Sequence, residues 1–171
     1  MYAPWRLAFL QGQAANEVPS PTGCIFCDYA QGAQDQRAWD QRRLVVTQRA
    51  HAFVILNKYP YSNGHVMVVP RVHTDQLETM DDATSAALQA LLRETIAAVR
   101  EVYRPDGLNI GMNMGEAAGA GIAGHIHWHV LPRWRGDVNF MPALADTKVI
   151  SESLTDCWHR LAQILRRAEE E

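Results

Sequence analysis

The chain has 171 residues, of which 47% are hydrophobic and 20% charged, and this predicts one soluble globular domain with a sizeable core. The formal net charge of −3 argues against the basic surface of a duplex nucleic-acid binder but is compatible with small phosphorylated ligands. No apolar run is long enough to span a bilayer or direct secretion, so we expect a cytoplasmic protein without a membrane partner.

The first half of the chain alternates short apolar runs with turn-forming residues. Residues 11–23 are rich in Gly, Pro, Ser and Asn, and they predict a surface loop. Short β-branched runs at 44–47, 52–56 and 65–69 predict antiparallel strands. The pattern then becomes helical, with leucines and valines on one face. It predicts a long helix that starts near Thr79, Asp81 or Asp82 and stops before Pro105 and Gly107.

The second half predicts two more strands, at 108–112 and 125–131, joined by a Gly-rich loop over 115–124. A final helix is expected over 153–167. This order predicts an α+β fold with an antiparallel sheet, one long inserted helix and a C-terminal helix. The expected organisation is a single domain over 1–171, with an N-terminal extension and loop (1–23), a core (24–150) and a C-terminal helical segment (151–171).

The stretch GHIHWHVLPRW carries histidines at alternate positions, His125, His127 and His129. On a strand, this spacing would place all three imidazoles on one face and the intervening apolar residues on the other. A neutral imidazole can bind a metal, attack phosphorus or exchange a proton near pH 7. The triplet therefore indicates a metal site or a catalytic site, with three structural histidines as the plainer alternative.

The segment CIFC places Cys24 and Cys27 at the spacing of half a zinc site or of a redox pair. No thioredoxin-like βαβ pattern surrounds it, which favours zinc, although two buried cysteines without a ligand are an alternative. His73 and one member of the histidine triplet are the natural further ligands. Cys157 is interpreted as a packing residue.

Two features next to the predicted strands could serve a ligand. The loop GEAAGAGIAG contains Gly119 and Gly121, whose lack of a side chain would let backbone N–H groups approach a phosphate. It is not a P-loop, because no Gly-Lys-Ser/Thr follows, and a plain turn is the alternative. His65 begins a strand directly after a glycine, a place where side chains often face a site.

HIHWHVL resembles the repeated histidine motif of the histidine triad (HIT) family, whose members bind nucleotides and act as hydrolases or transferases. The similarity extends to FVILNKYPYSNGHVMVVPRVH, to GLNIGMNMGEAAGAGIAGHIHWHVLPRW, and to the flanking APWR and RGDVNFMP. The chain looks most similar to the bacterial branch that handles diadenosine tetraphosphate, some of whose members are phosphorylases. The resemblance implies a HIT-like fold, an adenine nucleotide or dinucleoside polyphosphate as ligand, and a homodimer.

Carried over position by position, the resemblance assigns chemistry to five residues. His127 matches the nucleophile that attacks the α-phosphorus and forms a nucleotidyl–histidine intermediate. His129 matches the histidine that orients the phosphate, and His65 matches the histidine beside the nucleophile. Asn57 matches the ribose-binding residue and Asn113 the amide that touches the phosphates.

His125 matches a residue that, in zinc-containing bacterial relatives, completes a site with the CxxC pair and a histidine aligned to His73. The resemblance thus implies a structural zinc held by Cys24, Cys27, His73 and His125. Trp134 could either stack on a base or close the edge of the core.

Two departures bear on the reaction. Many relatives carry a Gln or Ser just before the triplet, where this chain has GIAG at 121–124, and the loop is one residue longer than in the smaller members. The acceptor that ends the reaction, water or phosphate, therefore stays open. The expected activity is nucleotidyl transfer without a catalytic metal. The alternatives are a purine nucleoside phosphoramidase-type hydrolase and a zinc-stabilised nucleotide-binding regulatory protein with little catalysis.

Overall fold

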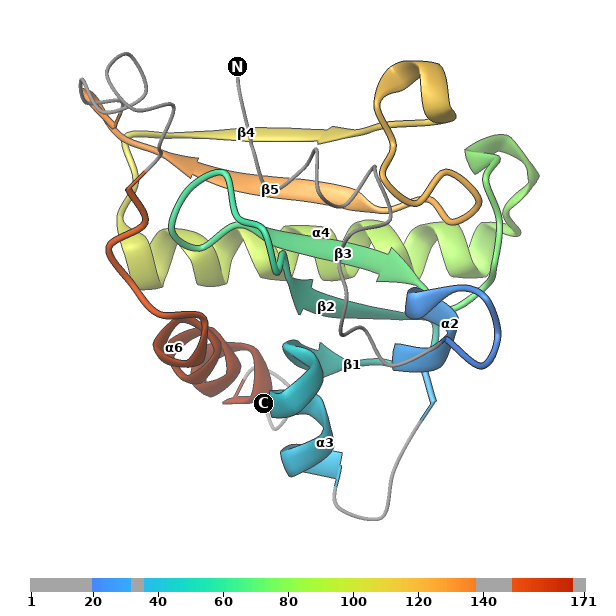
Figure 1. The fold of residues 1–171 in the computed structure, drawn as a ribbon, viewed down its shortest axis with the longest axis horizontal. Helices are drawn as coiled ribbons and strands as arrows, with labels where there is room; N and C mark the ends of the chain where they lie inside the picture. The colour runs from blue at the N-terminus through green and yellow to red at the C-terminus, as the bar shows by residue number, and fades with distance from the viewer. Residues whose placement is uncertain (1–19, 32–35, 138–148, 168–171) are drawn as a thin grey trace.

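A computed structural model describes residues 20–31, 36–137 and 149–167. These residues form a five-stranded antiparallel sheet with helices packed against it (Figure 1), which confirms the predicted α+β class. Most of the expected N-terminal loop, the APWR start and most of RGDVNFMP lie outside the described residues.

The strands are β1 (Val45–Gln48), β2 (Ala52–Leu56), β3 (Val66–Pro70), β4 (Gly107–Met112) and β5 (Trp128–Arg133). Their order across the sheet is β1-β2-β3-β5-β4, and all neighbours are antiparallel. Each predicted strand exists, with ends that differ by a few residues at most. Because β5 pairs with strands on both sides, the segment that carries the histidines is anchored in the interior of the sheet.

The long helix α4 (Asp82–Tyr103) is capped by Asp81, whose carboxylate accepts the N–H of Thr84 at 2.9 Å. It ends at Arg104, which is in the left-handed conformation.

The helix α6 (Leu154–Arg167) matches the predicted C-terminal helix. Two short helices, α2 (Ile25–Tyr29) and α3 (Gln36–Arg43), were not predicted, because segments this short show too little periodicity. Two 3₁₀ turns, η1 (Leu77–Thr79) and η2 (Glu116–Ala118), lie in connections.

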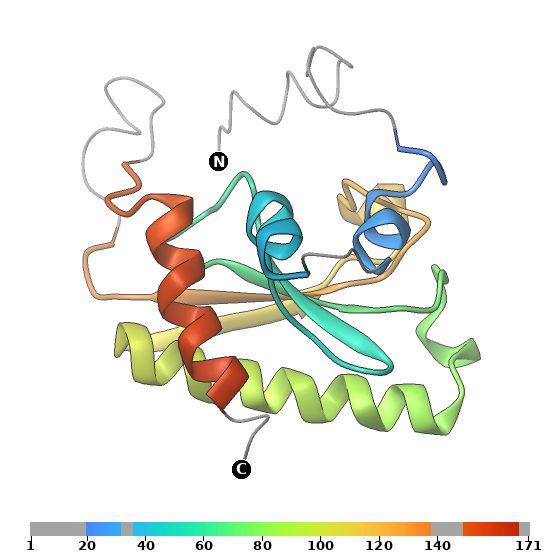
Figure 2. The same cartoon turned by 90° about the horizontal axis from the view of Figure 1, so that it is seen from below.

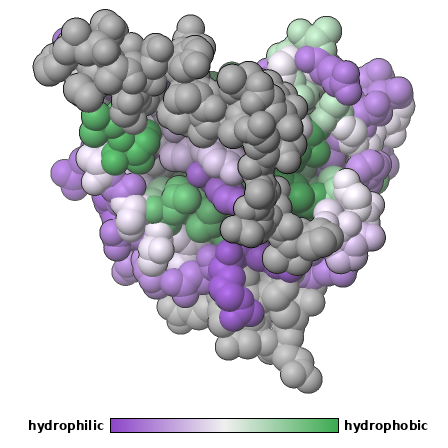
Figure 3. Space-filling view, in the orientation of Figure 1, coloured by the Kyte–Doolittle hydropathy of each residue, from purple (hydrophilic) through white to green (hydrophobic). Residues whose placement is uncertain are grey.

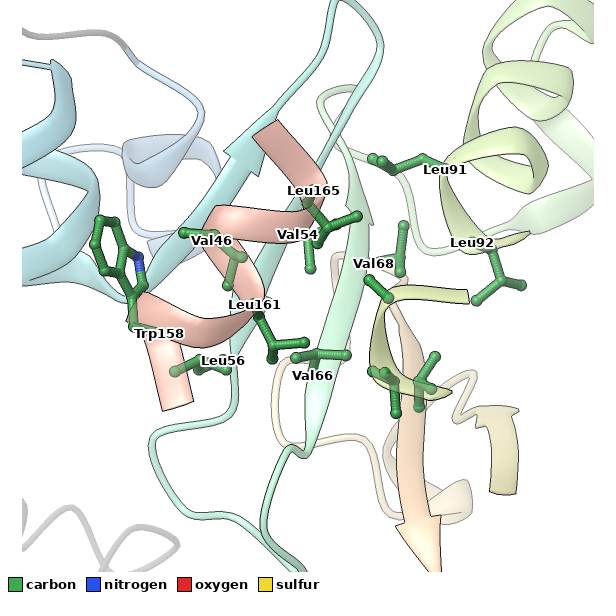
Figure 4. Packing of buried hydrophobic residues seen from close by; sticks show 14 of the residues in the cluster. Val46, Val54, Leu56, Val66, Val68, Leu91, Leu92, Trp158, Leu161 and Leu165 are labelled. Atoms are coloured by element: carbon green, nitrogen blue, oxygen red, sulfur yellow. The ribbon is translucent and has the colours of Figure 1, made fainter. Parts of the chain in front are cut away.

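Helices cover both faces of the sheet (Figure 2). On one face, Val54 and Leu56 of β2 belong to the main apolar cluster, which α4 and α6 complete (Figure 4). On the other face, Phe53 and Ile55 pack with Phe26 of α2. The central strands are therefore apolar along their whole length, and α2 is held directly against the sheet.

The prediction of a strand over 125–131 is wrong at its start, because β5 begins only at Trp128. The backbone N–H of Ile126 donates to the carbonyl of Thr74 at 2.8 Å, whereas ladder pairing begins with Trp128 opposite Val68. His125 and His127 therefore precede the strand. Their rings still lie on the same side of the sheet as His129, because Phe26 packs against both of them and the His127 ring is 4.9 Å from that of His129.

No helix in the described part of the chain is both long and apolar enough to cross a membrane. On the face shown in Figure 3, apolar residues form separate patches bordered by hydrophilic ones.

Candidate functional site

His127 is buried, with 4% of its surface exposed, and its partners determine its tautomer. Its Nδ1 lies 2.9 Å from the carbonyl oxygen of His125. A carbonyl can only accept, so Nδ1 carries the proton and Nε2 keeps its lone pair. Burial lowers the pKa of His127 below its usual range, although this hydrogen bond opposes the shift. The ring is therefore neutral at pH 7 and has the unprotonated nitrogen that a nucleophile needs.

His129 has the opposite tautomer, which is set through His65. The backbone N–H of Tyr61 donates to His65 Nδ1 at 3.2 Å, and the Asn57 amide lies 3.3 Å from the same nitrogen. His65 therefore carries its proton on Nε2, which lies 2.9 Å from His129 Nδ1. With its Nδ1 accepting, neutral His129 carries its proton on Nε2. Two neighbouring imidazoles thus present different groups, an unprotonated nitrogen on His127 and an N–H on His129.

A cavity of about 1220 Å³ connects the predicted catalytic and substrate-binding residues. Its lining includes His127, His129, Asn57, Asn113, Gly119 and Gly121. His65 is not one of the lining residues, but its ring contacts that of His129, which is, with 5.1 Å between centroids. Trp134 is not part of the lining and packs against Tyr103 at the end of α4, with 6.3 Å between ring centroids.

Both asparagines are held by backbone groups. Asn57 Oδ1 accepts the N–H of Tyr59 at 2.9 Å, which turns its NH₂ group toward His65. Asn113 Nδ2 donates to the carbonyl of Gly119 at 3.4 Å and closes the Gly-rich loop. Gly119 has a φ of 85°, a conformation that strongly favours glycine at this bend.

The lining of the cavity is positively charged, although the whole chain carries a net −3. Its Lys, Arg, Asp and Glu residues within the described part of the chain are Arg42, Arg43, Lys58 and Glu116. Three cations against one carboxylate favour an anionic ligand.

Two cysteines and two histidines form a second group of side chains, which includes His125, two residues before His127. Cys24 and Cys27 of the CIFC segment meet His73 and His125, and the four ligand atoms all lie within 4.8 Å of one another. Nδ1 of His125 is 3.4 Å from Cys24 Sγ and 3.6 Å from Cys27 Sγ, and Nδ1 of His73 is 3.2 Å from Cys27 Sγ. The two halves of the predicted site are thus brought together by the fold.

This cluster has the chemistry of a tetrahedral metal site. Zinc bound at its ordinary bond lengths separates sulfur from nitrogen ligands by about 3.5 Å, close to the distances observed here. His125 Nε2 lies 2.9 Å from the carbonyl oxygen of Pro70, so its proton is on Nε2 and Nδ1 is left to coordinate. Burial and the adjacent Cys24 raise the pKa of Cys27 to about 11, so without a cation this thiol stays protonated.

Two residues that support the histidines were missed from the sequence. Phe26, between the two cysteines, lies 5.0 Å from the His127 ring, measured between centroids. Tyr61 stacks on His65, at 5.2 Å between centroids, in addition to donating its N–H. The sequence shows Phe26 as an aromatic residue inside CIFC. It lies 101 positions from His127, so the sequence does not indicate that the two are in contact.

The turn before His65 gives a testable prediction. Gly64 has a φ of +73°, and a Cβ added there would lie 2.6 Å from Cε2 of Tyr103. The Tyr103 hydroxyl is held by Glu152 at 2.6 Å, so its ring cannot easily move away. We expect Gly64→Ala to lower the free energy of unfolding by about 2 kcal/mol or more, measured by chemical denaturation, and to reduce activity by displacing His65.

Gly136 provides the matched control. Its φ is +72°, but no atom of the described residues lies within 4 Å of its added Cβ. Gly136→Ala should therefore lower the free energy of unfolding only by the backbone strain, about 1 kcal/mol. Equal losses in the two variants would contradict the close approach of Tyr103 to this turn.

Comparison with known proteins agrees with this geometry. The HIT domain family matches residues 40–136. AP-4-A phosphorylase from Mycobacterium tuberculosis is 35% identical over 162 residues, which are 95% of this chain and 82% of that protein.

Solved structures share the fold. A zinc-bound histidine triad family protein from Mycobacterium smegmatis superimposes with a TM-score of 0.66 and 26% identity, covering 88% of this chain and 99% of the other. A diadenosine triphosphate hydrolase from Plasmodium falciparum, at 16% identity and a TM-score of 0.55, covers 76% of this chain and 79% of its own, and shares the fold alone. With its paired histidines at the cavity and a HIT match over more than half its length, the chain belongs to the histidine triad family.

Proposed function

We propose that the protein cleaves the α-phosphate linkage of dinucleoside polyphosphates such as diadenosine tetraphosphate, through a nucleotidyl intermediate on His127. The observation that carries the proposal is the neutral His127, whose unprotonated Nε2 belongs to a residue lining a cation-rich cavity. A neutral imidazole needs no activating base to attack phosphorus.

The proposed reaction has two displacements. In the first, the lone pair of His127 Nε2 forms an N–P bond to the α-phosphorus, and the P–O bond to the leaving polyphosphate breaks. The Nε2–H of His129 donates to the departing oxygen, while Asn113 and the backbone N–H groups of the Gly-rich loop stabilise the charge on the phosphoryl oxygens. In the second, an oxygen of water or phosphate attacks the same phosphorus, and the N–P bond breaks.

The size and charge of the cavity support a dinucleotide as substrate. Pockets for drug-sized ligands usually enclose about 300–1,000 Å³. The cavity of about 1220 Å³ exceeds this range, and it has three basic side chains for a phosphate chain. The similarity to an AP-4-A phosphorylase over 95% of the chain favours the same substrate class.

The acceptor distinguishes a phosphorylase from a hydrolase. We expect diadenosine tetraphosphate with inorganic phosphate to give ADP and ATP, and little product to form without phosphate, as the similarity to a phosphorylase suggests. Chromatography of the products with and without phosphate is the measurement.

Other products would identify the alternatives. AMP and ATP formed without phosphate would show that water is the acceptor. Cleavage of an adenosine phosphoramidate but not of the dinucleotide would favour a phosphoramidase. Tight AMP binding without turnover of either substrate would overturn the proposed activity in favour of a nucleotide-binding regulatory protein.

We also propose that Cys24, Cys27, His73 and His125 bind a structural zinc ion. The sulfur and nitrogen separations, the orientation of His125 by Pro70 and the similarity to a zinc-bound relative support this assignment. With four protein ligands, a bound zinc ion has no open position for a reacting water and supplies structure rather than catalysis.

A homodimer is the proposed assembly. Among the described strands, β4 forms one edge of the sheet, and Ile110 on this strand exposes 41% of its surface. An edge with unpaired backbone groups and an exposed apolar side chain suits pairing with a second copy. Sedimentation of a monomer at micromolar concentration would refute the dimer.

A further inference from the structure

The aromatic side chain between the two cysteines spans the distance between the metal-ligand cluster and the nucleophile. Phe26 is fully buried, and its ring centroid lies 5.0 Å from that of His127, with 56° between the planes. The same ring lies 5.4 Å from His125, nearly edge-on at 75°. One side chain of the CIFC segment therefore packs against both a ligand of the cluster and the nucleophile.

Phe26 restricts the movement of the His127 ring. A second ring contact comes from His129, whose ring lies 4.9 Å away at 73°. Because buried side chains are packed at crystal-like density, a buried ring in contact with two others cannot flip without displacing a neighbour. A flip of the imidazole would exchange Nδ1 and Nε2 and lose the hydrogen bond to the His125 carbonyl.

The cluster in turn determines where Phe26 lies. The helix α2 has only five residues, and a helix of that length is not stable without tertiary contacts. Cys24 and Cys27 anchor it to His125 and His73, and Phe53 contacts the Phe26 ring at 6.4 Å. Arg71 also donates to the carbonyl of Ala30 at the end of the helix. Metal loss would therefore loosen α2 without releasing it completely.

We propose that Phe26 is a positioning residue for the nucleophile, and that metal binding at Cys24 and Cys27 holds it in place. This rests on the proposed role of His127 as the attacking group. The cluster then acts on the reaction indirectly. The ring of His125 holds the metal, and the carbonyl of the same residue orients His127. Phe26 keeps the His127 ring from turning. Phe26 also borders the cavity, but its side chain is fully buried, and the role proposed for it is to position His127.

Phe53 provides a matched control for a substitution of Phe26. Both phenylalanines are fully buried in the same apolar cluster, so Phe26→Leu and Phe53→Leu should lower the free energy of unfolding by similar amounts. The ring contacts described for Phe53 do not include His127. We expect Phe26→Leu to lower kcat by about tenfold or more, whereas Phe53→Leu leaves kcat close to the wild-type value. Equal falls in kcat would overturn the proposal.

A readout without substrate separates this proposal from the proposed activity. NMR of the histidine ring nitrogens should show a single Nδ1-protonated tautomer of His127 in the zinc-loaded protein. Phe26→Leu, and wild-type protein after zinc removal, should show mixed tautomers or exchange broadening. An unchanged tautomer in both would overturn the positioning role. Failure of the wild-type protein to cleave a dinucleotide would instead overturn the activity and leave this measurement interpretable.

Discussion

Replacing His127 by alanine is expected to reduce cleavage of diadenosine tetraphosphate by on the order of 1,000-fold or more. The substitution removes the Nε2 lone pair, and no other described group is proposed to form the bond to phosphorus. The loss should fall on kcat, because Asn57, Asn113 and the Gly-rich loop still line the cavity. Nucleotide affinity, measured by calorimetry, should change only a few-fold.

His159 is the control for this experiment. It is an exposed histidine on α6, and its ring is 3.3 Å from the side chain of Gln41. His159→Ala should keep wild-type turnover. An undiminished rate in His127→Ala would refute the mechanism, and an equal loss in both variants would indicate a general effect on the fold.

Replacing Cys24 by serine is expected to abolish stoichiometric zinc binding and to lower the melting temperature by about 10 °C. A site occupied at about 1,000 times its dissociation constant stabilises a protein by about 4 kcal/mol. For a chain of this size, each kcal/mol corresponds to about 2–4 °C. Elemental analysis and thermal unfolding, with and without a chelator, measure both effects.

Cys157 is the matched cysteine for this test. It is buried at 4% exposure in the main apolar cluster, where the Tyr103 hydroxyl contacts its sulfur at 3.0 Å. Cys157→Ser should leave the zinc content at one ion per chain and the effect of a chelator unchanged. Full zinc content in Cys24→Ser would remove the CIFC segment from the site.

The fold was predictable where the hydrophobic pattern of the sequence continues over a whole helix or strand. The helical face of residues 82–103 and the β-branched runs of β2 and β3 each bury a continuous apolar surface, so local pattern and tertiary structure agree. The short helices α2 and α3 offer one or two turns each, too little for a pattern to emerge. They form because the sheet and the Cys/His cluster hold them.

The separate surroundings of the three histidines were predictable, but the start of the strand was not. The resemblance assigned His125 to the metal site and His127 and His129 to phosphorus chemistry, and the structure places them accordingly in the cluster and the cavity. The three rings do lie on one side of the sheet, but the expected strand start was wrong, because the N–H of Ile126 bonds to Thr74 and ladder pairing begins only at Trp128. That bond joins segments about fifty residues apart, which strand periodicity cannot reveal.

The tautomers could not be predicted from residue types either. They depend on backbone groups: the His125 carbonyl for His127, and the Tyr61 N–H, through His65, for His129. Any residue supplies such groups, so the sequence carries no mark of them. They become visible only when the turn over 59–65 and the segment before β5 are seen together.

The covalent intermediate tests the central claim most directly. Protein mixed briefly with diadenosine tetraphosphate that is radioactively labelled in the α-phosphates, then denatured in alkali, should retain the label as a phosphoramidate. Peptide mapping should place that label on His127, and His127→Ala should retain none. Turnover without any protein-bound label, or a label on another residue, would contradict attack by His127.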